Sequence, residues 1–132
     1  MSKIKDRIKE IEEFLKQLEK IMPDSLENYK KNIEKKAACE RYVEKIMEAA
    51  TDLAFLTIKT KKFDIPQDDI DAFNILKNEK IIDDGLALKL KDAKGMKNII
   101  AHEYGKIDDS IVFHSITEEL TKDIKELIKK IS

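Results

Sequence analysis

The segment MKNIIAHEYGKID, residues 96 to 108, gathers side chains that could handle a phosphate group. His102 is one of two histidines in the chain, and histidine is the side chain most often used for proton transfer near neutral pH. Lys97 supplies a fixed cation five residues earlier, and Asn98 supplies an amide one helical turn before His102. Tyr104 adds a phenol two residues later. A structural interpretation of His102 stays open as well, because the dipole and the last carbonyls of a helix favour histidine at its C-terminus.

Together these groups fit metal-free cleavage of a phosphodiester. A cation stabilises the charge that develops on the phosphorane oxygens, and an imidazole moves a proton at the attacking hydroxyl or the leaving oxygen. RNA carries its own nucleophile, the 2′-OH, so the reaction requires neither a serine nor a metal. Because the segment holds a single histidine, acid–base catalysis by two histidines needs a second copy of the chain, which a symmetric dimer provides.

Other chemistries find little support in the sequence. There is no Gly-rich phosphate loop, no Asp-x-Asp pair in a strand context and no metal-ligand spacing, so we expect neither a metal nor a cofactor. Cys39 is the only cysteine and is interpreted as a small core residue, not as a nucleophile. Glu103 is interpreted as a solvated neighbour of the histidine, and His114 as a structural residue.

The charge balance does not indicate a globally basic nucleic-acid binder, since 26 Lys and Arg face 27 Asp and Glu and the net charge is −1. Arg41 is one of only two arginines and is interpreted as an RNA contact or a salt-bridge residue. Lysine clusters at 30–36 and 59–62 allow two interpretations. They could hold RNA phosphates near a catalytic cleft between two copies of the chain. The favoured interpretation is that they are solvated faces interleaved with acids.

The elements that position these residues are predicted to be helices. The sequence has a 42% hydrophobic and a 40% charged fraction with only three Gly and two Pro, a composition typical of an all-α chain. Apolar residues recur with helical spacing. The predicted helices cover residues 4–21, 26–60 as one long helix, 68–77, 84–100 and 109–131. We expect a single domain over residues 1–132, an antiparallel four-helix bundle with one additional short helix.

Two features of the predicted helices bear on assembly. The second helix would be about 50 Å long at 1.5 Å per residue, so it must bend or meet a partner chain, which favours a homodimer. Gly95 lies inside the fourth helix, where it costs about 1 kcal/mol relative to alanine. We therefore expect another backbone to approach Gly95 closely.

The N-terminal stretch MSKIKDRIKEIEEF is charged throughout and lacks an apolar signal region. No stretch of the sequence approaches membrane-spanning length. We expect a cytoplasmic protein that does not associate with a membrane.

The segment GMKNIIAHEYGKIDDS resembles the signature of the HepT-like minimal toxins of the HEPN fold, in which an arginine precedes four residues, a histidine, any residue and a tyrosine. Lys97 stands at the arginine position, His102 at the histidine and Tyr104 at the tyrosine. Upstream, CERYVEKIMEAATDLAFLTI resembles the family's second-helix segment, where a charged pair precedes an EAAxDLA stretch. The similarity extends roughly from Leu26 onward.

This resemblance implies a small all-α protein that dimerises and brings two copies of the motif to a shared cleft. Many HEPN proteins are metal-independent ribonucleases, and HepT-like members act as toxins. An MntA-like nucleotidyltransferase neutralises them by transferring AMP from ATP to the motif tyrosine. By this resemblance His102 is the catalytic histidine, Lys97 the catalytic cation, Asn98 a positioning group and Tyr104 the AMP acceptor. The expected substrate is RNA, either tRNA or mRNA.

The departure from the motif is Lys97, because lysine lacks the planar fork with which arginine binds a phosphate through two parallel hydrogen bonds. Loss of such a contact costs about two to three orders of magnitude in rate. A second hypothesis is therefore a non-catalytic partner that a nucleotidyltransferase binds and modifies on Tyr104. A third is a plain helical oligomerisation module.

Overall fold

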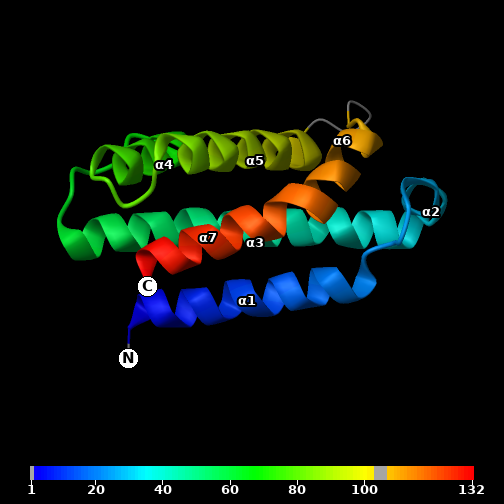
Figure 1. The fold of residues 1–132 in the computed structure, drawn as a ribbon, viewed down its shortest axis with the longest axis horizontal. Coiled ribbons are helices and arrows are strands. Elements are labelled where there is room, and N and C mark those ends of the chain that lie inside the picture. The colour runs from blue at the N-terminus through cyan, green and yellow to red at the C-terminus, as the bar shows by residue number, and fades with distance from the viewer. Residues whose placement is uncertain (1, 103–106) are drawn as a thin grey trace.

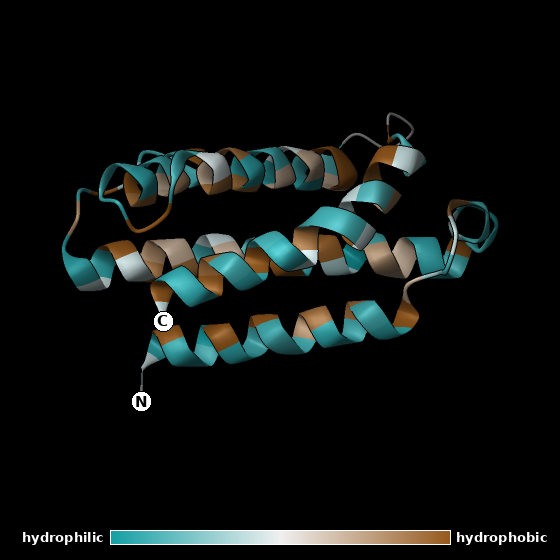
Figure 2. Cartoon of the chain, in the orientation of Figure 1, coloured by the Kyte–Doolittle hydropathy of each residue, from teal (hydrophilic) through white to brown (hydrophobic). Residues whose placement is uncertain are grey.

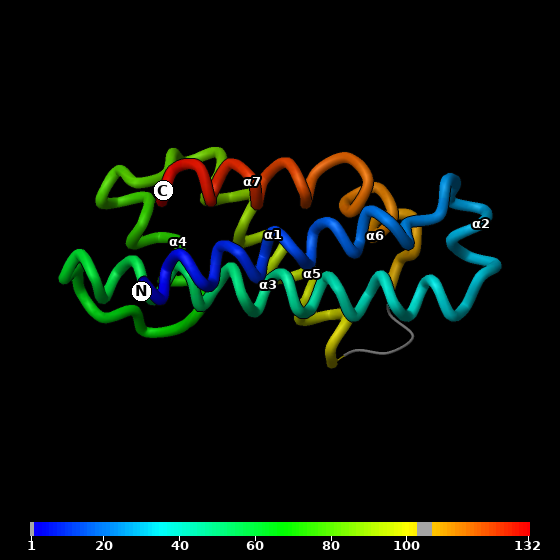
Figure 3. The backbone as a smooth tube through the Cα atoms, turned by 90° about the horizontal axis from the view of Figure 1, so that it is seen from below, coloured from blue at the N-terminus to red at the C-terminus, as the bar shows by residue number. Residues whose placement is uncertain are grey.

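The computed structural model describes residues 2–102 and 107–132, and the regular elements in these two ranges are all helical. Four long helical stretches run alternately up and down, as Figure 1 shows. They are α1 (Lys3–Ile21), α3 (Ile33–Lys61), α5 (Asp84–His102) and a C-terminal stretch that ends in α7 (Leu120–Ile131). Figure 3 shows α1 lying along α3. The predicted all-α, antiparallel four-helix bundle is confirmed.

The expected short helix is α4 (Asp69–Asn78), but a second short helix, α2 (Leu26–Lys31), was not predicted. The prediction of one long helix over residues 26–60 is wrong. Asn32 interrupts the helix, with φ −94° and ψ 91°. The Asn32 N–H donates to Asn28 O at 3.0 Å, and its Oδ1 accepts from Lys35 N at 3.0 Å. Asparagine is a preferred N-cap, so this side chain starts α3 at the point where α2 ends.

The break at Asn32 changes the shape of the bundle end. It lets α2 fold across that end and pack against α6 (Asp109–His114) (Figure 1). The long helix that remains, α3, has 29 residues and is about 44 Å long. The dimer was expected because an unbroken helix over residues 26–60 would be too long for its neighbours to cover. Since that helix is interrupted, this argument for a dimer no longer holds.

The C-terminal stretch was predicted as one helix and contains a π-helical turn, η1 (Ser115–Glu119), between α6 and α7. Its predicted start is confirmed, since Asp108 Oδ1 accepts from Ser110 N at 2.9 Å. Thr117 Oγ1 donates to Phe113 O at 2.8 Å within the π turn. A π turn holds one residue more than an α-helical turn, so it rotates the face that α7 turns toward the bundle.

The core lies between the inward faces of these helices, and Figure 2 shows hydrophilic residues along the outer faces. Cys39 is fully buried, as expected, and burial raises the pKa of its thiol to about 11, which does not suit a nucleophile. Arg7 joins α1 to α3 through Asp52 at 2.7 Å. The buried Lys94 joins α5 to the start of α4 through Asp69 at 2.8 Å. Within the described ranges, no helix combines the length and apolarity needed to cross a membrane.

Candidate functional site

The last turns of α5 carry three of the candidate residues. Ile100 is buried on the inner face of α5, while Asn98 and His102 are exposed one turn apart. Lys97 is half-buried and lies roughly 140° around the helix from His102. This arrangement places an amide and an imidazole on one exposed strip, while the backbone of Lys97 lies nearer the opposite side of the helix.

The other lysines of α5 have structural partners in the described residues. Lys89 Nζ lies 3.9 Å from Asp123 Oδ1, and Lys91 donates to Asn74 Oδ1 at 2.9 Å. The buried face of α5, which includes Leu86, Leu90, Lys94 and Ile100, sets the rotation of α5 about its axis. The rotation in turn determines that Asn98 and His102 lie on the outer side of the bundle.

The predicted AMP acceptor Tyr104 and its neighbour Glu103 lie outside the described residues. The start of α6, which follows them in the sequence, is held by two contacts. Asp108 caps α6, and its hydrogen bond from the Ser110 hydroxyl lowers the pKa of its carboxyl. Asp109 pairs with Lys36 Nζ at 2.9 Å, which ties the start of α6 to α3.

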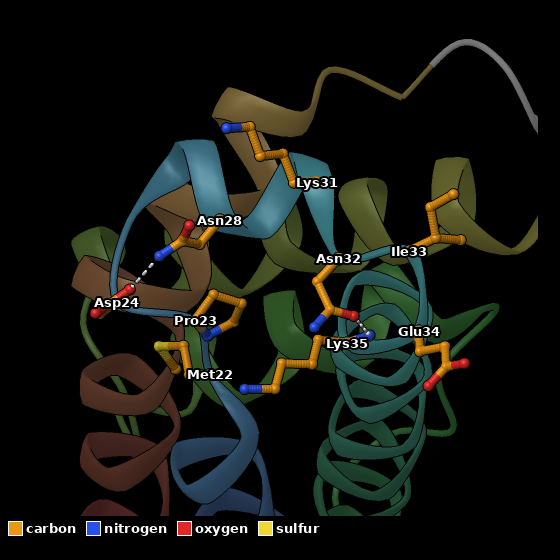
Figure 4. A pocket seen from close by; sticks show the side chains of 9 residues that line it. All are labelled: Met22, Pro23, Asp24, Asn28, Lys31, Asn32, Ile33, Glu34 and Lys35. Atoms are coloured by element: carbon orange, nitrogen blue, oxygen red, sulfur yellow. Dashed lines mark hydrogen bonds between the residues drawn. The ribbon is translucent and has the colours of Figure 1, made fainter.

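The lysine cluster at 30–36 lies around a hollow of about 730 Å³ at the end of the bundle. Figure 4 shows its lining residues, Met22, Pro23, Asp24, Asn28, Lys31, Asn32, Ile33, Glu34 and Lys35. The hollow has mixed charge: Asp24 accepts from Asn28 at 2.7 Å, and Lys31 pairs with Glu27 at 2.8 Å. The favoured interpretation, a solvated surface interleaved with acids, agrees with this geometry.

The second lysine cluster, at 59–62, lies at the opposite end of α3 from the end of α5 (Figure 1). Within one chain this cluster therefore lies at the other end of the bundle from His102. Arg41 is 58% exposed and pairs with Glu44 at 3.3 Å, so its salt-bridge interpretation is confirmed. Its contact with RNA stays a prediction. His114 is exposed at the end of α6.

The expectation that another backbone approaches Gly95 closely is wrong within the described chain. A Cβ added there would meet nothing within 4 Å, so no described backbone approaches it closely. Gly95 instead lines a groove of about 400 Å³ between α5 and α6, whose apolar walls include Ile99 and Ile111. These isoleucines are 39% and 62% exposed, and Figure 2 shows the hydrophobic colour of this region where α5 ends and α6 begins. The groove reaches the turn of α5 that ends in His102.

Sequence reasoning missed a polar cluster formed by Tyr29, Lys36, Glu40 and Asp109. The side chains come from α2, α3 and α6, so the break at Asn32 is what brings them together. Tyr29 Oη and Glu40 Oε2 are buried and find no hydrogen-bond partner among the described residues. The sequence contains one indication of this cluster, the second acid of the Asp108–Asp109 pair. Asp108 serves as the N-cap of α6, so Asp109 is free to interact elsewhere.

No group of three or more His, Cys, Asp and Glu in residues 2–102 and 107–132 is arranged to hold a metal ion. The groups that the described site offers are thus an imidazole, an ammonium and an amide on α5, beside an apolar groove. Such a site can bind an anion and transfer a proton.

Comparison with known proteins finds relatives that are nucleases. The sequence is 29% identical over 114 residues to a tRNA nuclease HepT of Aphanizomenon flos-aquae, covering 86% of this chain and 78% of that one. It is 29% identical over 86 residues to an mRNA nuclease HepT of Shewanella oneidensis, covering 65% and 64%.

The fold is similar to that of a solved tri-AMPylated HEPN toxin of Shewanella oneidensis in complex with MNT antitoxin. The TM-score is 0.92, with 24% identity and coverage of 99% and 98% of the two chains. The profile of the ribonuclease HepT-like family matches residues 4–131, nearly the whole chain. The chain therefore belongs to the ribonuclease HepT-like family.

Proposed function

We propose that this protein is the toxin of a toxin–antitoxin pair and acts as a metal-independent RNA endonuclease. The observation that carries the proposal is the family match over residues 4–131, combined with the exposure of His102 and Asn98 at the end of α5. Relatives that match most of the chain are a tRNA nuclease and an mRNA nuclease, which supports RNA as the substrate.

In the proposed reaction the 2′-OH of RNA attacks the neighbouring phosphorus and the bond to the 5′ oxygen breaks. The products are a 2′,3′-cyclic phosphate and a 5′-hydroxyl. One imidazole takes the proton from the 2′-OH, and a second gives a proton to the leaving oxygen. The ammonium of Lys97 stabilises the phosphorane charge, and Asn98 orients the phosphate. Two imidazoles in one cleft require His102 from each of two copies.

We place the second copy on the groove between α5 and α6. Its isoleucines are exposed, Gly95 leaves the helix surface open to a neighbouring backbone, and the groove adjoins the exposed end of α5. A two-fold axis through this surface sets the two α5 ends side by side, which is what the shared cleft needs. Arg41 is proposed to contact the RNA at the edge of this cleft.

Replacing Ile111 with aspartate is expected to convert the protein from a dimer to a monomer, because a carboxylate would be buried in the apolar interface. Sedimentation or light scattering measures the mass directly. Ile65 is 90% exposed in the segment after α3, so Ile65→Asp is a matched control and should leave the dimer intact. Unchanged mass in Ile111→Asp, with an unchanged helical circular dichroism spectrum, would place the interface elsewhere.

The activity itself is tested by incubating the purified protein with total RNA or tRNA in EDTA, alongside Lys97→Arg. We expect cleavage in both, and about two to three orders of magnitude faster cleavage with arginine, since its fork can bind phosphate through two hydrogen bonds. If neither protein cleaves RNA, the ribonuclease proposal is lost. Cleavage only without EDTA would contradict the metal-independent mechanism.

The neutralising partner is proposed to be an MntA-type nucleotidyltransferase that transfers AMP to Tyr104. The structurally similar toxin was solved in a tri-AMPylated form with MNT antitoxin, which supports this proposal. A second candidate function follows from Lys97. A chain without the motif arginine can have lost turnover and kept its role as a non-catalytic partner that this enzyme binds and modifies.

A further inference from the structure

The polar cluster where α2, α3 and α6 meet has no place in the proposed reaction. Tyr29 is fully buried and packs its ring 5.3 Å from that of Phe113, centroid to centroid. Its hydroxyl has no hydrogen-bond partner among the described residues. Burial raises the pKa of this phenol above its ordinary value, and the Glu40 carboxyl adds to the effect, so the hydroxyl keeps its proton.

Glu40 is half-buried on α3, and its Oε2 is also without a partner in the described part of the chain. It lies one helical turn after Lys36, whose Nζ pairs with Asp109 of α6 at 2.9 Å. The charged and titratable groups that act on it are Lys36 and Glu44 of α3 and Asp109 of α6, and it acts in turn on Cys39 and on Tyr29 of α2. Lys36 is occupied elsewhere, because its Nζ donates to Asp109 Oδ2 at 3.1 Å. Burial raises the pKa of Glu40, and the carboxylates of Asp109 and Glu44 act in the same direction against Lys36.

A buried carboxylate oxygen without a donor is costly, and this carboxylate has two further acids for neighbours. A proton removes the charge from Glu40 and adds a hydroxyl donor to a cluster that is rich in acceptors. A buried water molecule is the alternative way to satisfy the two orphaned oxygens. The two explanations differ in their pH dependence, since water would satisfy the ionised carboxylate equally well.

We propose that Glu40 is a positioning residue that anchors the first turn of α6 in its protonated form, together with Tyr29 and Asp109. Asp109 is the first residue of α6, so the cluster fixes the point at which the chain returns from the motif to the bundle. Protonation of one buried side chain is thus linked to the placement of α6. This inference does not depend on RNA cleavage and goes beyond the proposed function.

The direction of the pH effect follows from the raised pKa. The folded state binds the Glu40 proton more tightly than the unfolded state does. Its stabilising contribution is therefore complete below the ordinary pKa of glutamate, and it is lost as pH rises through the raised value. Glutamine has the shape of the protonated side chain and cannot ionise, so Glu40→Gln should keep the contribution at every pH.

The test is thermal unfolding of the full chain between pH 4 and pH 8, with amide hydrogen exchange of Asp109–Val112 as the local readout. We expect wild type to lose a few degrees of Tm relative to Glu40→Gln as pH rises, and to exchange faster in α6. Glu48→Gln is the matched control on the same helix, because Glu48 is exposed, and it should follow the wild-type pH profile. These readouts need no activity, so they are independent of whether the protein cleaves RNA.

Glu40→Leu separates the effect of a hydrogen bond at residue 40 from the effect of burying its side chain. It removes the hydroxyl that the protonated carboxyl can donate, so it should be less stable than Glu40→Gln at pH 5. Parallel pH profiles of wild type and Glu40→Gln overturn the proposal and favour a buried water. Equal stability of Glu40→Leu and Glu40→Gln at pH 5, with equal exchange in α6, overturns it as well.

Discussion

Replacing His102 with alanine is expected to lower RNA cleavage by about two to four orders of magnitude, the usual contribution of a general acid or base. His102 is exposed at the end of α5, so the substitution removes an imidazole from the site with little effect on packing. Rates measured on tRNA and on total RNA in EDTA give the comparison. Unfolding midpoints within a degree or two of wild type would show that the fold is unchanged.

The chain offers its own control, because His114 is the only other histidine and is also exposed at a helix end. His114→Ala should cleave at the wild-type rate. A shared cleft adds a further expectation: wild type refolded with an excess of His102→Ala should lose more activity than dilution explains, because mixed dimers hold one imidazole. Equal rates for His102→Ala and wild type would remove this residue from the mechanism.

Much of the fold follows from the spacing of apolar residues, and the failure at Asn32 has a physical reason. Leu26, Tyr29, Ile33 and Ala37 continue one helical stripe across it, so periodicity alone predicts an unbroken helix. Asparagine competes with the backbone for hydrogen bonds, however, and here it caps α3. The choice between interior and cap depends on whether α2 finds a surface to pack on, and α6 provides that surface far along the chain.

The π turn at Ser115–Glu119 and the surroundings of Gly95 could not be predicted from the sequence either. Nothing in the sequence SITEE marks one extra residue in a helical turn, because the insertion is decided by how Ile116 and Leu120 both reach the core. The cost of a glycine inside α5 suggested a close backbone neighbour, and the described chain provides none at Gly95. Whether the neighbour is a helix of the same chain or of another copy is a question of tertiary contacts.

For the candidate site, sequence reasoning found the residues that share one helix turn and missed those that converge from different elements. His102 and Asn98 are one turn apart, and their exposure follows from the burial of Ile100. Glu40 and Tyr29 belong to one cluster only because α2 ends and α3 begins at Asn32. A charged residue on a long helix usually remains solvated, so nothing in the sequence distinguishes Glu40 from its many acidic neighbours.

The largest effect is expected at the predicted modification site. Incubated with ATP, Mg²⁺ and its cognate nucleotidyltransferase, the protein should gain about 329 Da per AMP unit, and each unit adds a phosphate charge as phosphorylation does. Tyr104→Phe removes the hydroxyl that accepts AMP, so the mass gain should vanish entirely. Intact-mass spectrometry measures this directly. Tyr42→Phe is the control, since Tyr42 is half-buried against Phe14 and should leave the adduct unchanged.

The same pair of variants separates the two candidate functions. If the protein is a ribonuclease toxin, the AMP charge placed two residues from His102 should repel the RNA backbone and stop cleavage, and Tyr104→Phe should cleave RNA even with the partner and ATP present. A non-catalytic partner would gain the adduct on Tyr104 and cleave no RNA in either form. A mass gain that persists in Tyr104→Phe would instead place the modification on another residue, and the motif tyrosine would then have no role in neutralisation.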